Sequence, residues 1–119
     1  MMNRKITRRC PAELAIYMVG NKWKLLVLKD LSMGTRRFGE LMRSVQGISQ
    51  KVLTTALRSM EKDGLIERKA YAEAPPKVEY SLTEVARNLC PILDLLGDWG
   101  IKYGSQYGMD CVYDPTAAA

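Results

Sequence analysis

The residues between positions 47 and 64 place apolar and polar side chains at the spacing of an amphipathic helix bounded by two glycines. Its apolar face carries Leu53, Ala56, Leu57 and Met60. A second stripe is cationic at both ends and hydroxylic in the middle, stands next to Gln50, and consists of Lys51, Thr54, Thr55 and Arg58. Lysine and arginine reach guanine or phosphate, glutamine reaches adenine, and threonine contacts phosphate or a thymine methyl group. The pattern predicts a helix that suits the major groove of DNA, although this helix alone leaves a merely solvated face as the alternative.

Two helices are predicted near the N-terminus. The first begins at Cys10-Pro11, because proline is tolerated at a helix start, and ends at Gly20. Asn21 is a good N-cap for the second helix, over residues 22–31. That helix is apolar nearly all round, so we expect it in the core; its apolar residues are Trp23, Leu25, Leu26, Val27, Leu28 and Leu31.

A helix-turn-helix is predicted next. Residues 33–37 read as a turn and a short extended piece, and residues 38–45 as a third helix with an apolar face. A glycine-containing turn follows at residues 46–48, and Ser49 is a suitable N-cap for the amphipathic helix described above. Helix, short turn and second helix therefore follow one another in the order that this motif requires.

A two-stranded hairpin is predicted after the glycine at position 64. Residues 65–71 and 78–82 read as strands, and the second alternates apolar and polar positions as a half-buried strand does. Two prolines in the loop over residues 72–76 prevent regular pairing there. The basic residues on or near the hairpin, which could touch phosphates, are Arg68, Lys69 and Lys77.

A long amphipathic helix is predicted to begin after Thr83, which can cap it. Apolar residues recur every three to four positions along it: Val85, Leu89, Ile92, Leu96, Trp99 and Tyr103. Pro91 lies inside the pattern and should kink the helix or split it. After Gly104 the periodicity is lost. This helix has more apolar surface than so small a domain covers easily, which favours an interface between two copies over closure of a monomer core.

Composition narrows the function classes. The chain has 119 residues, 18 basic against 13 acidic side chains, a net charge of +5 and a pI near 9.2, which suit one domain with a polyanionic partner. There is no histidine, no glycine-rich phosphate loop and no clustered pair of carboxylates. We therefore expect no enzyme, no metal site and no cofactor.

The cysteines at positions 10, 90 and 111 match neither a zinc site nor a secreted disulfide framework. The basic N-terminal residues precede a short apolar run, but no cleavage site follows, and no segment is long enough to span a bilayer. These features favour a cytoplasmic protein with free thiols and no contact with a membrane.

The predicted fold is mainly α-helical with a small β-hairpin (α+β): a winged helix-turn-helix with a terminal dimerisation helix. It divides into a basic arm over residues 1–9, a winged domain over residues 10–104 and a tail over residues 105–119. The chain also resembles the HxlR-type branch of the MarR-like transcriptional regulators. The motifs that carry the resemblance are Cys10-Pro11, Gly20-Asn-Lys-Trp23, Arg37-Phe38-x-x-Leu41, Gly47-Ile-Ser-Gln-Lys51, Leu53-Thr54, Leu57-Arg58, Gly64-Leu65 and Pro75-Pro76-x-Val-Glu-Tyr-Ser-Leu-Thr83.

The resemblance implies a bacterial or archaeal homodimer on a pseudo-palindromic operator in double-stranded DNA. It implies that the helix after Ser49 enters the major groove, that the hairpin flanks it, and that the terminal helix forms the dimer with help from the first. The expected interface residues are Leu14, Leu89, Ile92, Leu93, Leu96, Trp99 and Tyr103. The expected groove and nearby phosphate contacts are Ser49, Gln50, Lys51, Thr54, Thr55 and Arg58, and the expected phosphate contacts are Arg36, Arg37, Arg68, Lys69 and Lys77.

Cys10 is a candidate redox sensor. A helix N-terminus and the neighbouring Arg8 and Arg9 favour the reactive thiolate, whereas Glu13 opposes it. The resemblance implies that some relatives sense electrophiles or oxidants through a cysteine at this place, and that Cys111 of the other subunit could be its partner. Three alternatives stay open: a small-molecule effector, constitutive DNA binding without an effector, and a winged module that binds protein.

Overall fold

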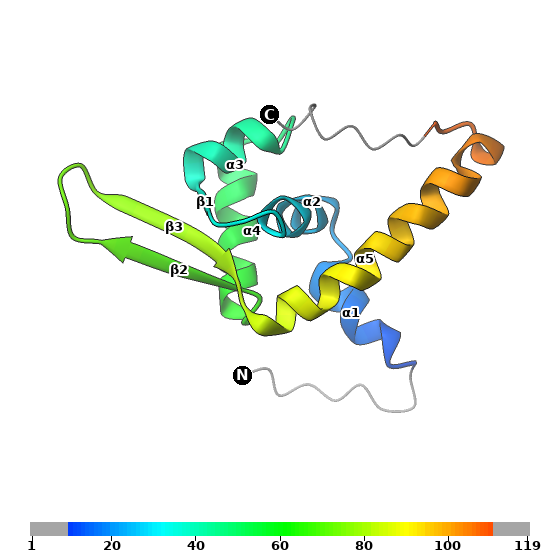
Figure 1. The fold of residues 1–119 in the computed structure, drawn as a ribbon, viewed down its shortest axis with the longest axis horizontal. Helices are drawn as coiled ribbons and strands as arrows, with labels where there is room; N and C mark the ends of the chain where they lie inside the picture. The colour runs from blue at the N-terminus through cyan, green and yellow to red at the C-terminus, as the bar shows by residue number, and fades with distance from the viewer. Residues whose placement is uncertain (1–9, 111–119) are drawn as a thin grey trace.

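The computed structural model describes residues 10–110 and confirms a winged helix-turn-helix that is mainly α-helical with a small sheet (Figure 1). The predicted arm over residues 1–9 and Cys111 lie outside the described residues. The elements in chain order are α1 (Ala12–Val19), α2 (Lys22–Leu31), β1 (Arg36–Arg37), α3 (Phe38–Ser44), α4 (Gln50–Lys62), β2 (Ile66–Tyr71), β3 (Lys77–Leu82), α5 (Glu84–Tyr103) and the 3-10 helix η1 (Gly104–Tyr107).

The helical body lies between two projections. In Figure 1 the β2–β3 hairpin extends to one side of α2 and α4, and α5 extends to the other. Predicted caps fix the helix starts: Asn21 Oδ1 accepts a hydrogen bond from the Trp23 amide at 2.8 Å, and Thr83 Oγ1 accepts one from the Ala86 amide at 3.4 Å. The Thr83 hydroxyl also donates to the Gly64 carbonyl at 2.7 Å. Thr83 therefore ties the start of α5 to the end of α4.

The sheet has one strand more than predicted. Its order is β1-β3-β2, all antiparallel, so β3 is central. The piece predicted to be extended is β1, in which Arg36 pairs with Tyr80 and Arg37 with Glu79. A strand of two residues has no periodicity from which its pairing could be predicted. β3 is partly buried on both faces rather than alternating, because it has a neighbour on each side.

One hydrophobic core joins the helices to the base of the sheet, and its fully buried side chains include Val27, Leu28, Leu41, Leu53, Met60 and Leu65. The prediction that α2 lies in the core is confirmed for one side of the helix, while its other side is partly exposed. Leu25 and Leu26 are 38% and 37% exposed, whereas Leu28 is completely buried. A chain of this size has too few elements to surround a central helix.

The terminal helix is continuous. Of the kink or split predicted at Pro91, the split does not occur, because α5 runs through this residue from Glu84 to Tyr103. Proline removes one amide donor from the helix interior without ending the helix here. Helical structure continues past Gly104, where the apolar periodicity of the sequence is lost. There η1 continues from α5, and the Met109 amide bonds the Gly104 carbonyl at 2.9 Å.

Asp30 on α2 is a buried carboxylate, 8% exposed. Its Oδ2 has no hydrogen-bond partner among the described residues, and Arg36 Nε lies 3.8 Å from it. Burial raises the pKa of Asp30 above 3.8, and Arg36 opposes this rise. Above pH 3.8 the folded protein therefore keeps a proton that the unfolded chain releases.

The protonation of Asp30 should make the free energy of unfolding depend on pH. The Asp30 contribution to the free energy of unfolding should fall as the pH rises from 3.8 through the folded-state pKa. Asp30→Asn should remove that slope, which urea unfolding across this pH window would measure as the difference between the two proteins. Asp98→Asn, at an exposed site on α5, is the control. An Asp30→Asn protein that keeps the full slope would contradict the assignment.

Candidate nucleic-acid interface

The helix α4 has the two faces predicted for it. Leu53, Leu57 and Met60 are buried in the core, whereas the polar face is exposed except for the partly buried Thr54: Gln50, Lys51, Thr55 and Arg58. Ser49 is confirmed as the N-cap, because its Oγ accepts a hydrogen bond from the Val52 amide at 3.1 Å. Its hydroxyl oxygen therefore serves the helix start.

The polar groups on the first turns of α4 differ in what they can offer a ligand. The Thr55 hydroxyl donates to the Lys51 carbonyl at 2.9 Å, so its proton is used within the helix and its methyl group and oxygen remain. Within residues 10–110, neither the Lys51 ammonium nor the Gln50 amide makes a hydrogen bond or ion pair. These two side chains are the free donors at the start of α4.

The turn between α3 and α4 is anchored in the core by a buried side chain. Gly47 has a φ of +83°, in the left-handed region that favours glycine, and closes the turn between α3 and α4. Ile48 is 6% exposed and its amide donates to the Val45 carbonyl at 3.3 Å. The buried isoleucine anchors the turn, so α4 is fixed in direction relative to α3.

The sheet separates the predicted wing cations onto two faces. Arg68 pairs with Tyr80, and Lys69 pairs with Glu79. Because successive side chains of a strand point to opposite faces, Arg68 shares a face with the buried Ile66 and faces the helical body. Lys69 points the other way. The three cations predicted to contact phosphate therefore lie on two different faces of the hairpin.

A tyrosine organises the outer face of the hairpin. The Lys69 and Lys77 ammonium groups lie 5.1 and 4.3 Å from the centre of the Tyr71 ring, within the range of cation–π attraction. The Tyr71 hydroxyl donates to Glu79 Oε1 at 2.9 Å, and Lys77 Nζ lies 4.0 Å from Glu79 Oε2. Lys77 is therefore partly neutralised in the free protein. Neither Tyr71 nor Glu79 was singled out in the sequence, because only their pairing across strands gives them this role.

The inner face of the hairpin meets α4 around a hollow of about 370 Å³. Its lining includes Thr54, Leu57, Arg58 and Glu61 from α4, together with Arg68 from β2 and Tyr80 from β3. We call it the α4–sheet hollow. The structure therefore brings together three predicted contact residues, Thr54, Arg58 and Arg68. Glu61 and Tyr80 were missed, since their spacing along the chain gives no sign of this meeting.

The two β1 arginines have different surroundings. Arg36 is partly buried beside the Asp30 carboxylate, so its charge is shared with an internal partner. Arg37 is exposed, and its amide donates to Glu40 Oε1 at 2.8 Å at the start of α3. Of the two, Arg37 offers the freer guanidinium to an external phosphate.

A model of HxlR-like helix-turn-helix proteins matches residues 18–107 of this chain. The chain belongs to this family. A transcriptional regulator of the helix-turn-helix type from Methanothermobacter thermautotrophicus is 49% identical over 96 residues, which cover 81% of this chain and 73% of that protein. This HxlR-like protein is accordingly a transcriptional regulator with a DNA-binding helix-turn-helix domain, and not an enzyme.

Solved structures share the fold. The redox regulator HypR in its oxidised form is 42% identical, with a TM-score of 0.73 over 78% of this chain and 96% of that one. Its reduced form has a TM-score of 0.78 at 38% identity, over 83% of this chain and 98% of that one. The HxlR-like chain thus aligns with nearly the whole of both HypR structures.

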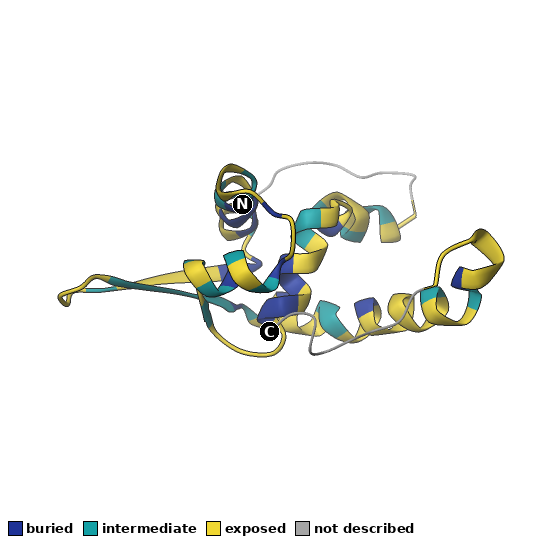
Figure 2. Cartoon of the chain, turned by 90° about the horizontal axis from the view of Figure 1, so that it is seen from above, coloured by how far each residue is buried: buried dark blue, intermediate teal, exposed yellow. Residues whose placement is uncertain are grey.

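A second surface of this HxlR-like protein lies on its terminal helix. Every residue of α5 from 94 to 99 is exposed, and Figure 2 shows that this part of the helix projects from the body. Large apolar side chains recur on it, with Ile92, Leu96 and Trp99 exposed to 51%, 63% and 57%. We call these three residues the α5 stripe. Leu14 on α1 is exposed to 47%.

Two of the predicted interface residues are packed against the core of the chain. Leu93 is only 8% exposed, and Leu89 is partly buried against the same cluster. They lie on the side of α5 that faces the body, which helical spacing alone does not distinguish from the neighbouring stripe. Tyr103 is partly buried, and its ring centre lies 5.4 Å from that of Trp99. Tyr107 of η1 stacks on Trp99 at 6.3 Å and was missed, because it lies beyond the predicted end of the helix.

The described cysteines have different environments. Cys10 is exposed at the start of α1, where its carbonyl accepts a hydrogen bond from the Glu13 amide at 2.9 Å. Cys90 is packed against the core, as predicted, and its Sγ contacts the Ala86 carbonyl at 3.5 Å. Burial raises the pKa of Cys90 above 9.0, and the Asp94 carboxylate adds to this. At neutral pH Cys90 is therefore a thiol of low reactivity.

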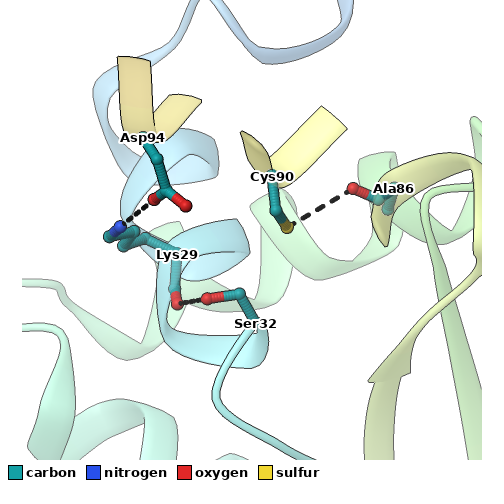
Figure 3. A network of polar contacts seen from close by, with 5 residues as sticks. All are labelled: Lys29, Ser32, Ala86, Cys90 and Asp94. Atoms are coloured by element: carbon teal, nitrogen blue, oxygen red, sulfur yellow. Dashed lines mark hydrogen bonds and ion pairs between the residues drawn. The ribbon is translucent and has the colours of Figure 1, made fainter. Parts of the chain in front are cut away.

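A second hollow, of about 410 Å³, lies between α2, the end of β3 and α5. Figure 3 shows two of its lining residues, Cys90 and Asp94 of α5, and the ion pair that Asp94 makes with Lys29 of α2. Ser32, Arg87 and Pro91 also line it. Its volume suits a small molecule, but its lining mixes charges of both signs and so points to no single class of ligand.

Among residues 10–110, no helix is long and apolar enough to cross a membrane. The same residues contain no group of three or more cysteine, aspartate or glutamate side chains placed to hold a metal ion.

Proposed function

We propose that this transcriptional regulator is a homodimer that binds a pseudo-palindromic operator in double-stranded DNA through α4 and the β2–β3 hairpin. The observation that carries the proposal is the exposed polar face of α4. It presents free lysine, glutamine and arginine side chains, while its opposite face is fixed in the core. A rigid helix with this composition can read base edges in the major groove.

The dimer part of the proposal rests on the α5 stripe. Its side chains form an apolar surface that the monomer leaves in water. The helix that carries them, α5, extends from the opposite side of the body to the hairpin (Figure 1). A two-fold axis through α5 would cover the stripe and present two copies of α4 to one side of a duplex. Successive major grooves lie about 34 Å apart, which sets the spacing of the two half-sites.

The experiment that tests this function is selection of random duplex DNA on the purified, reduced protein. An enriched inverted repeat with half-sites about one helical turn apart would support a dimeric, sequence-specific regulator. Enrichment of a single short site would argue against the dimer. Absence of enrichment at low salt, together with salt-insensitive binding to a protein partner, would favour the interaction module instead.

A pair of lysines separates base reading from phosphate binding. Lys51→Ala, at the start of α4, should weaken operator binding by about 1–3 kcal/mol and relax specificity at one position of each half-site. Lys69→Ala, on the hairpin, should weaken binding to DNA of every sequence alike and make the affinity less dependent on salt. Fluorescence anisotropy on operator and scrambled duplexes measures both. Identical behaviour of the two variants would refute this division of roles.

We further propose that Cys10 makes the regulator responsive to electrophiles or oxidants. Cys10 is exposed, and HypR, which shares the fold, is a redox regulator. The second sulfur would be Cys111 of the partner subunit, a residue outside the described range. The low reactivity expected of Cys90 leaves it out of this chemistry.

Diamide treatment tests the sensor. It should produce a species of dimer mass on a non-reducing gel and change operator affinity, and Cys10→Ser and Cys111→Ser should each abolish both effects. Cys90→Ser is the matched control and should respond as the unchanged protein does. Unchanged mobility and affinity after treatment would leave a constitutive DNA binder, or one whose effector is a small molecule.

A further inference from the structure

The α4–sheet hollow has an apolar base and two cationic sides. Leu57 lies in its lining on the core side of α4, and Arg58 and Arg68 come to it from different elements. Within the described chain neither guanidinium makes a hydrogen bond or an ion pair, although the Glu61 carboxylate shares the lining. Two unpaired like charges beside one hollow repel each other, and an anion between them would remove the repulsion.

The chemistry of the hollow suits a phosphate. Arginine presents its donors in a planar fork that matches two phosphate oxygens, and two arginines can hold one phosphate from both sides. The hydroxyl groups of Thr54 and Tyr80 are further donors in the lining, and neither is used in a hydrogen bond within residues 10–110. Glu61 is the only acidic residue in the lining, so the net charge there is positive.

The position of Arg58 along α4 sets which part of DNA it meets. Recognition helices contact base edges chiefly with their N-terminal residues. Arg58 lies eight residues after Gln50, where α4 begins, which is about two turns along the helix. Here the sheet stands beside the helix. With α4 in the major groove, the DNA backbone that borders the groove on the side of the hairpin would pass this point.

We propose that the α4–sheet hollow binds one phosphate of the DNA backbone, held jointly by Arg58 and Arg68, and that Arg58 therefore reads no base. The proposal rests on the proposed function, because it needs α4 in the major groove. Sequence is then read by the first two turns of α4 alone. Glu61 weakens the attraction of the hollow for the phosphate and so limits binding to DNA of any sequence.

The test compares Arg58→Ala, Arg68→Ala, the double variant and Glu61→Gln on the selected operator and on a scrambled duplex. Each single arginine variant should lower the affinity of the protein for both duplexes by the same factor. Each should also flatten the slope of log K against log salt by about 0.9 per protomer, the value for one phosphate. The double variant should flatten the slope no further, because the two arginines share that phosphate. Glu61→Gln should raise the affinity of the protein for both duplexes by the same factor.

Controls separate the outcomes. Lys62→Ala removes an exposed cation of α4 outside the hollow and should leave the slope unchanged. If Arg58→Ala weakened binding to the operator but not to the scrambled duplex, Arg58 would contact a base. If the changes in salt slope of the two single variants added up in the double variant, the two arginines would contact two different phosphates. Either result overturns the proposal. Failure of the unchanged protein to bind any duplex would overturn the proposed function with it.

Discussion

Replacement of Leu96 by glutamate is expected to give a monomer in solution and to lower operator affinity by about 10³-fold or more. Leu96 is 63% exposed in the middle of the α5 stripe, so its replacement should leave the fold of the chain intact. In the proposed dimer the new carboxylate would be buried against an apolar partner, which costs several kcal/mol. A monomer contacts one half-site, and its affinity should approach that of non-specific binding.

Sedimentation and fluorescence anisotropy together test this prediction. The mass of Leu96→Glu should be that of one chain, and its circular dichroism should match that of the unchanged protein. Asn88→Glu introduces the same charge at an exposed polar position of α5 outside the stripe and should remain dimeric. A Leu96→Glu protein that stays dimeric would show that the two copies meet elsewhere. A folded monomer that binds the operator as tightly as before would separate DNA binding from dimerisation.

The elements that could be predicted from sequence are those whose signals are local. The range of α2 and the start of α4 matched because Asn21 and Ser49 act on amides two or three residues away. The chain turns after α4 through a residue with a φ of +76°, a conformation that favours glycine, and the sequence has Gly64 at this position. Periodicity also placed the buried face of α4 correctly, since one helical turn brings its members together.

The features that could not be predicted depend on pairing between distant segments. Strand β1 exists only because β3 offers it an edge, more than forty residues later in the chain. The register of β2 against β3 decides that Arg68 faces α4 while Lys69 faces away, and a shift by one residue would reverse both. Likewise, Leu89 and Leu96 both belong to the apolar pattern of α5, and only the packing of α5 on the body distinguishes the residue against the core from the exposed one.

Replacement of Leu53 by alanine should lower the free energy of unfolding by about 2–5 kcal/mol, as large-to-small changes in a packed core do. Leu53 is fully buried on the face of α4 opposite its polar stripe. Loss of this size is a large fraction of the roughly 5–15 kcal/mol that stabilises a typical domain. Urea unfolding at one fixed protein concentration measures it, because dimerisation would make stability depend on concentration.

Thr55→Ala is the matched control on the same helix. Its side chain is exposed and bonds only the Lys51 carbonyl one turn away, so stability should change by no more than about 0.5 kcal/mol. The two variants should then have opposite effects on stability and on binding. Leu53→Ala should be less stable, but its folded fraction should bind the operator normally. Thr55→Ala should be as stable as the unchanged protein but should bind the operator more weakly. A Leu53→Ala protein of unchanged stability would mean that α4 is not held by the core. Its direction relative to the hairpin would then have to come from DNA itself.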